Sequence, residues 1–464
     1  MKRILILVLA GLSALIVVGY AAGAWFVGKQ VEATIDERYK ALHDYAPFVT
    51  VSDRKYERGI FSSAETVTVN IAPVSGATRL RFIVTSRIKH LPLPGLISLS
   101  SATVDSKLVY ADGGNPDVVE WTGGKDLATV HTAFNFNGGG STTITVPAFN
   151  SARLSSDEAT LKIDYSGDLA HYSMQGNAPR FAIMDKTGAR VQFAGMHLDG
   201  DHQRIFPEVP NLYSGSDHFS IEQIAVAAPG MSAEAGLLKK LAVDVMANAG
   251  ADREYIDITE KIGAGSIKVL GVDYGPAQFD LSVHHVHART IARLSQLDWN
   301  ALGKNSVASP QATEALTKDI ETIFLHNPEV RVDRFSFTVP EGETVVSALF
   351  KVNDAQPGDF ANPMALAGKA YVSVDFKAPE KFLSGLSQGA FASAMQQGGG
   401  FDKELARMLA EGYVTREGEY IKTRFELHDA KPWFNGKQYV PPSVARNPAP
   451  AAPARPPARK FRQY

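Results

Sequence analysis

The sequence of 464 residues contains no cysteine. Disulfide bonds, thiolate metal sites and cysteine nucleophiles are therefore excluded. This absence does not identify a compartment, because exported proteins of this size can fold without disulfides.

The sequence also lacks an excess of either charge, with 47 Lys and Arg residues against 49 Asp and Glu and a formal net charge of −2. A general nucleic-acid-binding protein normally has a basic excess, so we expect no nucleic-acid partner. Hydrophobic residues make up 45% of the chain, an ordinary globular composition that leaves room for two or three domains.

A long uncharged run begins close to the first residue. Residues 4–28 carry no charge and follow Lys2 and Arg3. As a helix this run covers roughly 35 Å, enough to cross a hydrocarbon core of about 30 Å. Lys2 and Arg3 should stay in the cytoplasm, and Trp25 fits the opposite interface. We therefore predict that residues 1–28 anchor the chain in a membrane, with the bulk of the protein on the side opposite the cytoplasm.

A cleaved secretory signal is the alternative interpretation of this run. Ala22 and Ala24 have the small-residue spacing that a signal peptidase accepts. A typical signal has an apolar region of about 7 to 15 residues, and this run is far longer, which favours an uncleaved anchor. Both interpretations export the rest of the chain.

An amphipathic helix is predicted to follow over residues 29–47 and to end near Pro47. Its apolar stripe consists of Val31, Ile35, Tyr39 and Leu42. Such a helix can lie on the bilayer or pack on the following domain. Its polar face is not notably basic, which favours packing.

From there the hydrophobic pattern changes to a period of two. The clearest alternating apolar series are Phe61, Val67, Val69 and Ile71; Leu161, Ile163 and Tyr165; Phe335, Phe337 and Val339; and Val372, Val374 and Phe376. Strict alternation is typical of antiparallel strands with one buried and one solvated face. We predict a mostly β (α+β) region over residues 48–440, with large, curved antiparallel sheets and a division into two halves near 210–235.

A few helices are expected between the strands. One begins at Ser309-Pro310, buries Ala312, Leu316, Ile320 and Ile323/Phe324, and stops at Asn327-Pro328. Others are indicated by Phe382, Leu383, Leu386 and Phe391, and by Leu405, Met408 and Leu409 with Gly412 as the terminating residue. Residues 237–248 favour a strand, because Val243 and Val245 alternate with Asp244 and Met246.

The last segment, residues 441–464, is built from Pro, Ala and Arg without an acidic residue. It cannot bury a core, so we predict a disordered basic tail. Such a tail could bind an anionic lipid, an envelope polymer or an acidic protein, or have no partner.

Several segments together resemble a known family. They are Tyr45-Ala46-Pro47, Tyr56-Glu57-Arg58-Gly59-Ile60-Phe61-Ser62-Ser63, Ile88-Lys89-His90-Leu91-Pro92-Leu93-Pro94, Gly412-Tyr413-Val414-Thr415, Glu419-Tyr420 and Trp433-Phe434-Asn435-Gly436-Lys437. This combination resembles the YdgA-like family of bacterial envelope proteins, a domain of unknown function, over the whole chain except the tail. Relatives tend to have His-Gly-Pro where this chain has His90-Leu91-Pro92. The resemblance implies a β-rich, periplasm-facing protein anchored in the inner membrane, and it supplies no catalytic residues.

The family motifs are interpreted physically as structural. Gly59 allows a tight turn before a strand whose buried face would begin at Phe61. Asn435-Gly436 is a strong signal for a type I′ hairpin.

The densest group of potential ligands is His284, His285 and His287. In a regular strand His285 and His287 would share one face, where they could bind a metal, but a catalytic zinc site needs a third protein ligand. A second group, residues 214–218, reads Ser-Gly-Ser-Asp-His and is interpreted as a turn before a strand starting at Phe219. No P-loop, Gly-x-Ser-x-Gly or His-Glu-x-x-His motif is present.

The leading hypothesis is a non-enzymatic envelope protein, either a scaffold or a β-groove that binds lipid or an envelope protein. No catalytic, cofactor-binding or metal-binding residue is assigned and no cofactor is expected. The alternatives are a membrane-tethered hydrolase, metal-dependent through His285 and His287, and a scaffold that recruits partners through its basic tail.

Overall fold

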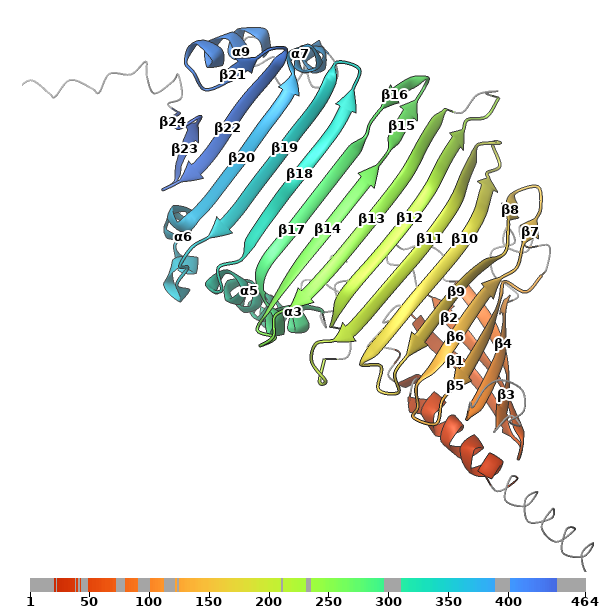
Figure 1. The fold of residues 1–464 in the computed structure, drawn as a ribbon. Coiled ribbons are helices and arrows are strands. Elements are labelled where there is room, and N and C mark those ends of the chain that lie inside the picture. Colours follow the sequence, from red (N-terminus) through yellow and green to blue (C-terminus); the bar gives the residue numbers. More distant parts are fainter. Residues whose placement is uncertain are drawn as a thin grey trace, which may run out of the picture.

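The architecture was determined from a computed structural model. It describes residues 21–42 (except 22, 38 and 41), 49–71, 80–90, 101–111, 122, 125–209, 212–230, 235–295, 310–388 and 401–439. All described strands belong to one sheet, which runs from β1 near the N-terminal helix to β24 at the other end (Figure 1). The predicted mostly β fold with antiparallel sheets is confirmed.

The strands follow one another along the chain with few interruptions. Their bounds are β1 Val49–Arg58, β2 Ser62–Ile71, β3 Leu80–His90, β4 Ala102–Tyr110, β5 Ala128–Phe134, β6 Gly140–Val146, β7 Phe149–Asn150, β8 Leu154–Ser156, β9 Ala159–Tyr165, β10 His171–Met184, β11 Arg190–Arg204, β12 Tyr213–Ala227, β13 Gly236–Ala249, β14 Tyr255–Ala264, β15 Ser266–Val269, β16 Val272–Tyr274, β17 Ala277–His287, β18 Glu329–Val339, β19 Gly342–Val352, β20 Ala370–Pro379, β21 Thr415–Glu417, β22 Tyr420–His428, β23 Lys431–Phe434 and β24 Lys437–Gln438.

Neighbours in the chain are mostly neighbours in the sheet. Strands β1 to β6 pair in order, β6 pairs with β9, and β9 to β14 again pair in order. Pairing then continues through β17, β18, β19, β20 and β22 to the terminal hairpin. Every one of these pairs is antiparallel, as expected when short turns join consecutive strands. Within the interval 210–235, β12 pairs along its length with both β11 and β13, so the sheet is continuous there.

The register divides the sheet into two chemically different surfaces. Twelve strands, namely β5, β6, β9 to β14 and β17 to β20, each contribute one residue to a directly paired series that we call the apolar row. It consists of Val130, Ile144, Leu161, Gly176, Leu198, Phe219, Val243, Ile262, Phe279, Phe335, Val346 and Phe376. Successive side chains alternate between the faces of a strand, so their chain neighbours lie on the opposite surface.

Ten of those neighbours belong to a second set, the polar row. The polar row contains one directly paired residue from each of β3 to β6, β9 to β14, β17 and β18. Its members are Arg87, Asp105, His131, Thr143, Lys162, Gln175, Asp199, His218, Asp244, Lys261, Asp280 and Arg334. We call the surfaces that contain the two rows the apolar surface and the polar surface. The alternation predicted from sequence therefore extends coherently across most of the sheet.

In the part of the chain that the structure describes, no second layer covers the apolar row. None of its twelve residues is buried: eleven are half-buried, and Phe335 is 41% exposed. Within the five long strands β10 to β14, the buried side chains are those of Ala182, His202, Ile221 and Ile256. Among the described residues, this part of the sheet is therefore a single layer.

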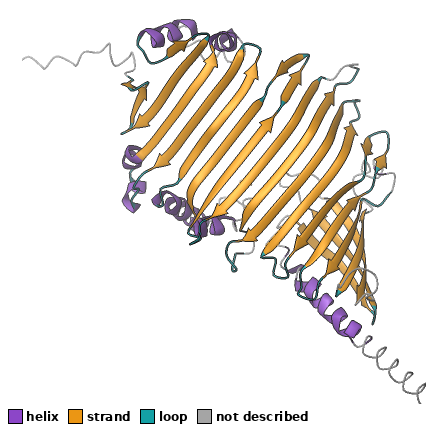
Figure 2. Cartoon of the chain, viewed as in Figure 1, coloured by secondary structure: helices purple, strands orange, loops and turns teal. Residues whose placement is uncertain are grey.

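Helices lie at the margins of the sheet, and strands fill its centre (Figure 2). They are α3 Ala288–Ser295, α5 Pro310–Leu325, α6 Pro363–Lys369, α7 Glu380–Gln388 and α9 Phe401–Ala410, with one 3₁₀ helix, η1 Pro357–Ala361. The three predicted helices correspond to α5, α7 and α9. Gly412 has a positive φ of 75° after α9, and residues 237–248 lie in strand β13, both as predicted.

The N-terminal helix, whose described residues are 21, 23–37, 39, 40 and 42, packs on the apolar surface at the β1 end of the sheet. Val27 and Val31 form a buried cluster with Ile88 and Ala102, and Ile35 packs against it. The prediction that this helix packs on the following domain is confirmed. The helix is continuous through Gly28, and its buried positions start at Ala24.

A second buried cluster covers the apolar surface at the edge where β11 ends. Ile205, Phe206, Val209 and Leu212 from the β11–β12 connection pack on Ile256 and on Ala288 and Ala292 of α3. This loop and helix close the margin and do not extend over the apolar row.

Several predicted burial assignments are wrong. Phe61 lies in the β1–β2 turn, before β2 begins at Ser62, and is 48% exposed. Near a register shift between Val332 and Phe335, Phe335 is exposed and Ser336 is buried, the reverse of the predicted pattern. Ile320 of α5 is exposed, because the helix lies at the sheet margin and buries only part of the expected stripe.

Within the described residues, no helix is both long and apolar enough to span a membrane. Residues 1–20, which hold most of the predicted anchor, lie outside the described residues, as do Tyr45-Ala46-Pro47 and the predicted tail at 441–464.

Candidate functional site

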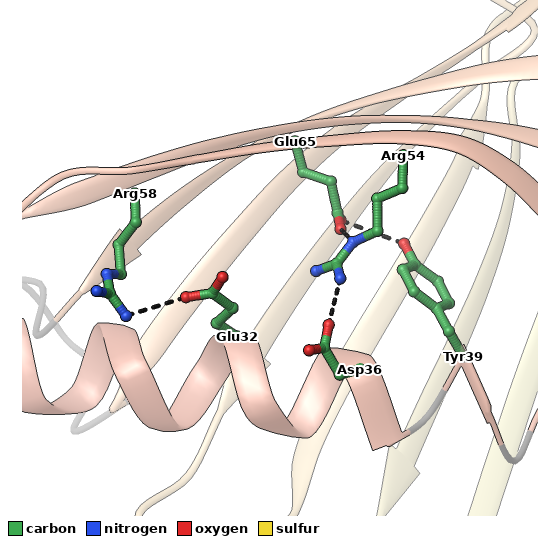
Figure 3. A network of polar contacts seen from close by, with 6 residues as sticks. All are labelled: Glu32, Asp36, Tyr39, Arg54, Arg58 and Glu65. Carbon is green, nitrogen blue, oxygen red and sulfur yellow. Dashed lines mark hydrogen bonds and ion pairs between the residues drawn. The ribbon is translucent and has the colours of Figure 1, made fainter.

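A polar network joins the N-terminal helix to strands β1 and β2 (Figure 3). Arg54 of β1 lies between Asp36 of the helix and Glu65 of β2, with Nε donating to Glu65 Oε1 at 2.5 Å and Nη1 donating to Asp36. Tyr39 donates from its hydroxyl to the other carboxylate oxygen of Glu65 at 3.2 Å. We call these four residues the helix clamp.

The helix clamp is withdrawn from water at Glu65, whereas Asp36 at its other end is 43% exposed. The Glu65 side chain is 4% exposed, so its charge depends on Arg54 for compensation. Burial, followed by the negative charge of Glu65, raises the pKa of Tyr39 above its ordinary value. The Arg54 guanidinium also lies over the rings of Tyr39 and Tyr56, at 5.4 and 5.1 Å from their centroids.

One histidine links the helix to two of the family motifs. His90 is 1% exposed; its Nδ1 donates to the carbonyl of Ile60 at 3.0 Å, and Nε2 lies 3.0 Å from the Ser63 hydroxyl. A carbonyl only accepts, so Nδ1 carries a proton and Ser63 donates to Nε2 in the neutral ring. A Cβ on Gly28 would lie 2.4 Å from His90 Cε1, so only glycine lets the helix approach this closely.

Sequence reasoning treated these motifs as separate structural signals, and it missed the helix clamp. A signal was available, because Glu65 occupies the same face of β2 as Val67 and Val69. A charged residue in an apolar series indicates a buried partner, which here comes from the next strand and the helix.

The polar surface is hollowed over β10 to β14. The hollow has a volume of about 930 Å³, and its lining includes Gln175, Asp199, His218, Asp244 and Lys261. Hydrogen bonds between neighbouring strands hold the histidine rings on this surface, and His218 Nδ1 donates to Asp244 at 2.6 Å. Likewise His131 donates to Asp105 at 2.7 Å, and this bond lowers the pKa of Asp105 below its ordinary value. These solvated pairs are typical of a water-facing surface.

His285 and His287 lie on one side of the sheet, as predicted, but not through regular alternation of a strand. The register to β14 shifts between Ile256 and Ile258, and His285 has a positive φ of 62°, so a bulge interrupts the alternation. Both rings lie around Tyr255, with His285 stacked on it at 3.8 Å and His287 edge-on at 6.5 Å.

A histidine far along the chain completes this cluster. His326, just after α5, stacks on His287 at 4.3 Å with parallel rings, and its Nδ1 lies 3.1 Å from the Tyr255 hydroxyl. Burial, followed by the nearby His326, lowers the pKa of His287, which favours its neutral form. Parallel stacked rings do not direct their nitrogens at a common point. In the part of the chain that the structure describes, no group of three His, Cys, Asp or Glu residues is placed to bind a metal.

The predicted turn at residues 214–218 is also wrong, because the segment lies inside β12. Asp217 lies on the apolar surface and bonds to His202 at 3.0 Å, whereas His218 lies on the polar surface and bonds to Asp244. The strand places Asp217 and His218 on opposite faces, so they cannot act together with one serine.

The Asn435-Gly436 turn is confirmed. It joins β23 to β24, and its two residues have φ values of 47° and 76°, the positive pair that a type I′ turn requires.

Comparison with known proteins gives a family match and one related sequence. Residues 1–442 match the model described as "Bacterial protein of unknown function (DUF945)". The protein YdgA of Escherichia coli (strain K12) is 20% identical over 384 residues, which cover 75% of each chain. No solved structure matches. The match to the family ends where the predicted basic tail begins, in agreement with the resemblance noted from the motifs.

Proposed function

The chain belongs to the DUF945 family of bacterial proteins of unknown function, and we propose that it is a membrane-tethered protein that binds the acyl chains of envelope lipids on its apolar surface. The uncharged N-terminal run tethers it to the inner membrane, and the sheet lies in the periplasm. The polar surface keeps the single-layer sheet soluble in water.

The half-exposed apolar row is the observation that carries this proposal. Twelve directly paired positions without a charged or hydrogen-bonding side chain cross the sheet, and none is buried. At about 4.8 Å between strands the row is about 50 Å long, more than the hydrocarbon thickness of about 30 Å of a bilayer. A contiguous apolar surface of this size marks a binding site in a soluble domain.

The residue at which the N-terminal helix begins to pack on the sheet supports the proposed membrane tether. Packing on the sheet begins at Ala24, so residues 4–23 are available to span the bilayer. Twenty helical residues cover about 30 Å, which matches the hydrocarbon core. Lys2 and Arg3 precede them and favour a cytoplasmic N-terminus.

Acyl chains fit the apolar surface better than a protein segment does. A bound extended strand needs unpaired backbone groups, but in β10 to β14 both edges of each strand pair within the sheet. A hydrocarbon chain needs only apolar contact, which the row supplies. The apolar surface also starts beside the helix that leads to the predicted anchor, which gives lipids a short path from the bilayer.

Photo-crosslinking at two adjacent positions of β12 tests the proposal. A benzophenone side chain replaces Phe219 on the apolar row or His218 on the polar row, in the full chain expressed in its membrane. We expect lipid adducts, identified by mass spectrometry, at position 219 and several-fold fewer at 218.

Three results would count against lipid binding. They are equal labelling at both positions, no adduct at position 219, and adducts at 219 that consist of a second copy of the chain or another protein.

A further inference from the structure

Five large apolar side chains are exposed at the end of the sheet where the N-terminal helix packs. Trp25 and Phe26 belong to the helix, Ile60 and Phe61 to the β1–β2 turn, and Phe136 to the β5–β6 turn. Their exposed fractions range from 47% for Trp25 to 68% for Phe136. We call this set the turn patch.

Several contacts connect the parts of the turn patch to one another. Trp25 lies 5.9 Å from the guanidinium of Arg58 at the end of β1. His90 hydrogen-bonds the Ile60 carbonyl while packing against Gly28. Phe136 lines a small cavity of about 100 Å³ together with Val27 and Val31 of the helix. Both turns therefore lie next to one stretch of helix.

The sequence that precedes the turn patch identifies its partner. The uncharged run of residues 4–28 contains the buried helix position Ala24 and the exposed Trp25 and Phe26 close to its end. Exposed Trp and Phe beside an anchor are typical of the headgroup region, where an aromatic ring is stable between water and hydrocarbon. Lys29 follows these aromatic residues on the helix and is exposed, so its charge suits anionic headgroups. The Arg58 guanidinium, which lies over the Trp25 ring, is paired with Glu32 at 3.1 Å.

We propose that the β1–β2 and β5–β6 turns are inserted into the headgroup region of the membrane that holds the anchor. Ile60, Phe61 and Phe136 then act as fixed contacts that set the angle of the sheet to the bilayer. The helix clamp and His90 make this orientation rigid. The inference rests on the proposed tether but not on lipid binding by the apolar surface.

The absence of native cysteine permits a direct depth measurement. Single cysteines replace Ile60, Phe136 or Leu270 in the full chain and receive a nitroxide label. Leu270, in the β15–β16 turn, is the matched control, because it is an equally apolar turn residue, 73% exposed, at the opposite strand ends (Figure 1). Labelled protein is reconstituted into vesicles of phosphatidylethanolamine and phosphatidylglycerol, and collision rates with oxygen and with a water-soluble nickel complex are compared.

We expect labels at positions 60 and 136 to favour oxygen several-fold over the nickel complex, and the label at 270 to favour the nickel complex. If all three labels behave as water-exposed while the protein floats with the vesicles, the inference is wrong and the tether stands. If the full chain does not float with vesicles, both the tether and this inference are wrong.

Discussion

The β1 end and the centre of the apolar surface differ in what covers them. At the β1 end, the N-terminal helix buries Ile88 and Ala102 and is held by the helix clamp. Across the centre, the same alternation continues, but residues such as Phe219 and Val243 are only half-buried. The strand pattern is alike in both regions, so the pattern alone does not determine whether an apolar face becomes core or remains open. A covering element decides it.

Ion pairs in the helix clamp and in the polar row also differ in burial. In the helix clamp, Arg54 compensates a buried carboxylate, and in the polar row Arg334 pairs with Glu343 where both side chains are at least 40% exposed. Buried and solvated ion pairs of similar geometry differ greatly in the cost of losing one partner. We therefore expect substitutions at the helix–sheet contact to have larger effects than matched substitutions elsewhere in the molecule.

Truncation of Ile88 should have the largest effect. Ile88→Ala removes a fully buried side chain from the helix–sheet cluster and should lower the free energy of unfolding by about 2–5 kcal/mol. Ile262→Ala, at a half-buried position of the apolar row, should cost less than half of that, about 1 kcal/mol. Denaturant unfolding of the detergent-solubilised chain measures both. Equal losses would show that the two regions are covered alike.

Loss of Arg54 should come next. Arg54→Met leaves Glu65 buried beside Tyr39 without a cation and should destabilise helix docking by about 2 kcal/mol, after allowance for the partial exposure of Arg54. Arg334→Met removes an exposed pair and should change stability by less than about 1 kcal/mol. Hydrogen exchange of β1 and of the helix reports the difference. An unchanged exchange rate in Arg54→Met would contradict the role of the helix clamp.

Two glycine-to-alanine substitutions should change the stability of the protein in opposite directions. Gly28→Ala places a Cβ against His90 and should weaken helix docking by about 1–3 kcal/mol. Gly385→Ala in α7 adds a Cβ where no atom lies within 4 Å and should stabilise by up to about 1 kcal/mol through helix propensity. Thermal unfolding separates the two. Stabilisation by both substitutions would mean that the helix does not approach His90.

The smallest effect should be a pH dependence at the helix clamp. The pKa of Tyr39 is raised in the folded protein, so the folded state retains a proton that the unfolded state releases above pH 10. The contribution is complete below pH 10 and is lost as the pH rises further. Tyr39→Phe should therefore show a shallower loss of stability between pH 9 and pH 11 than the unchanged protein. Identical slopes would contradict burial of the Tyr39 hydroxyl.

Much of the fold could be predicted from the sequence, because alternation and turn residues are local signals. Strands such as β9 and β20, the turn at Asn435-Gly436 and helices α5, α7 and α9 follow from such patterns. Burial at single positions could not be predicted where a register shift or the edge of the sheet intervenes, as at Phe335 and Ile320.

The candidate sites were less predictable, because they depend on contacts between distant segments. The helix clamp joins residues up to 29 positions apart in sequence, Asp36 and Glu65, and His326 reaches His287 from beyond α5. The bulge at His285 has no local sequence signal of its own. The coherence of the apolar row follows only when the register of all strands is known.

The most direct measurement is the number of acyl chains bound by the purified full chain, determined by extraction and mass spectrometry. Phe219→Glu on the apolar row is compared with His218→Glu on the polar row, and hydrogen exchange of β12 verifies that both variants are folded. We predict that Phe219→Glu loses at least one bound acyl chain per protein and that His218→Glu retains the original number. Equal acyl-chain content in the original protein and both variants would contradict lipid binding by the apolar surface.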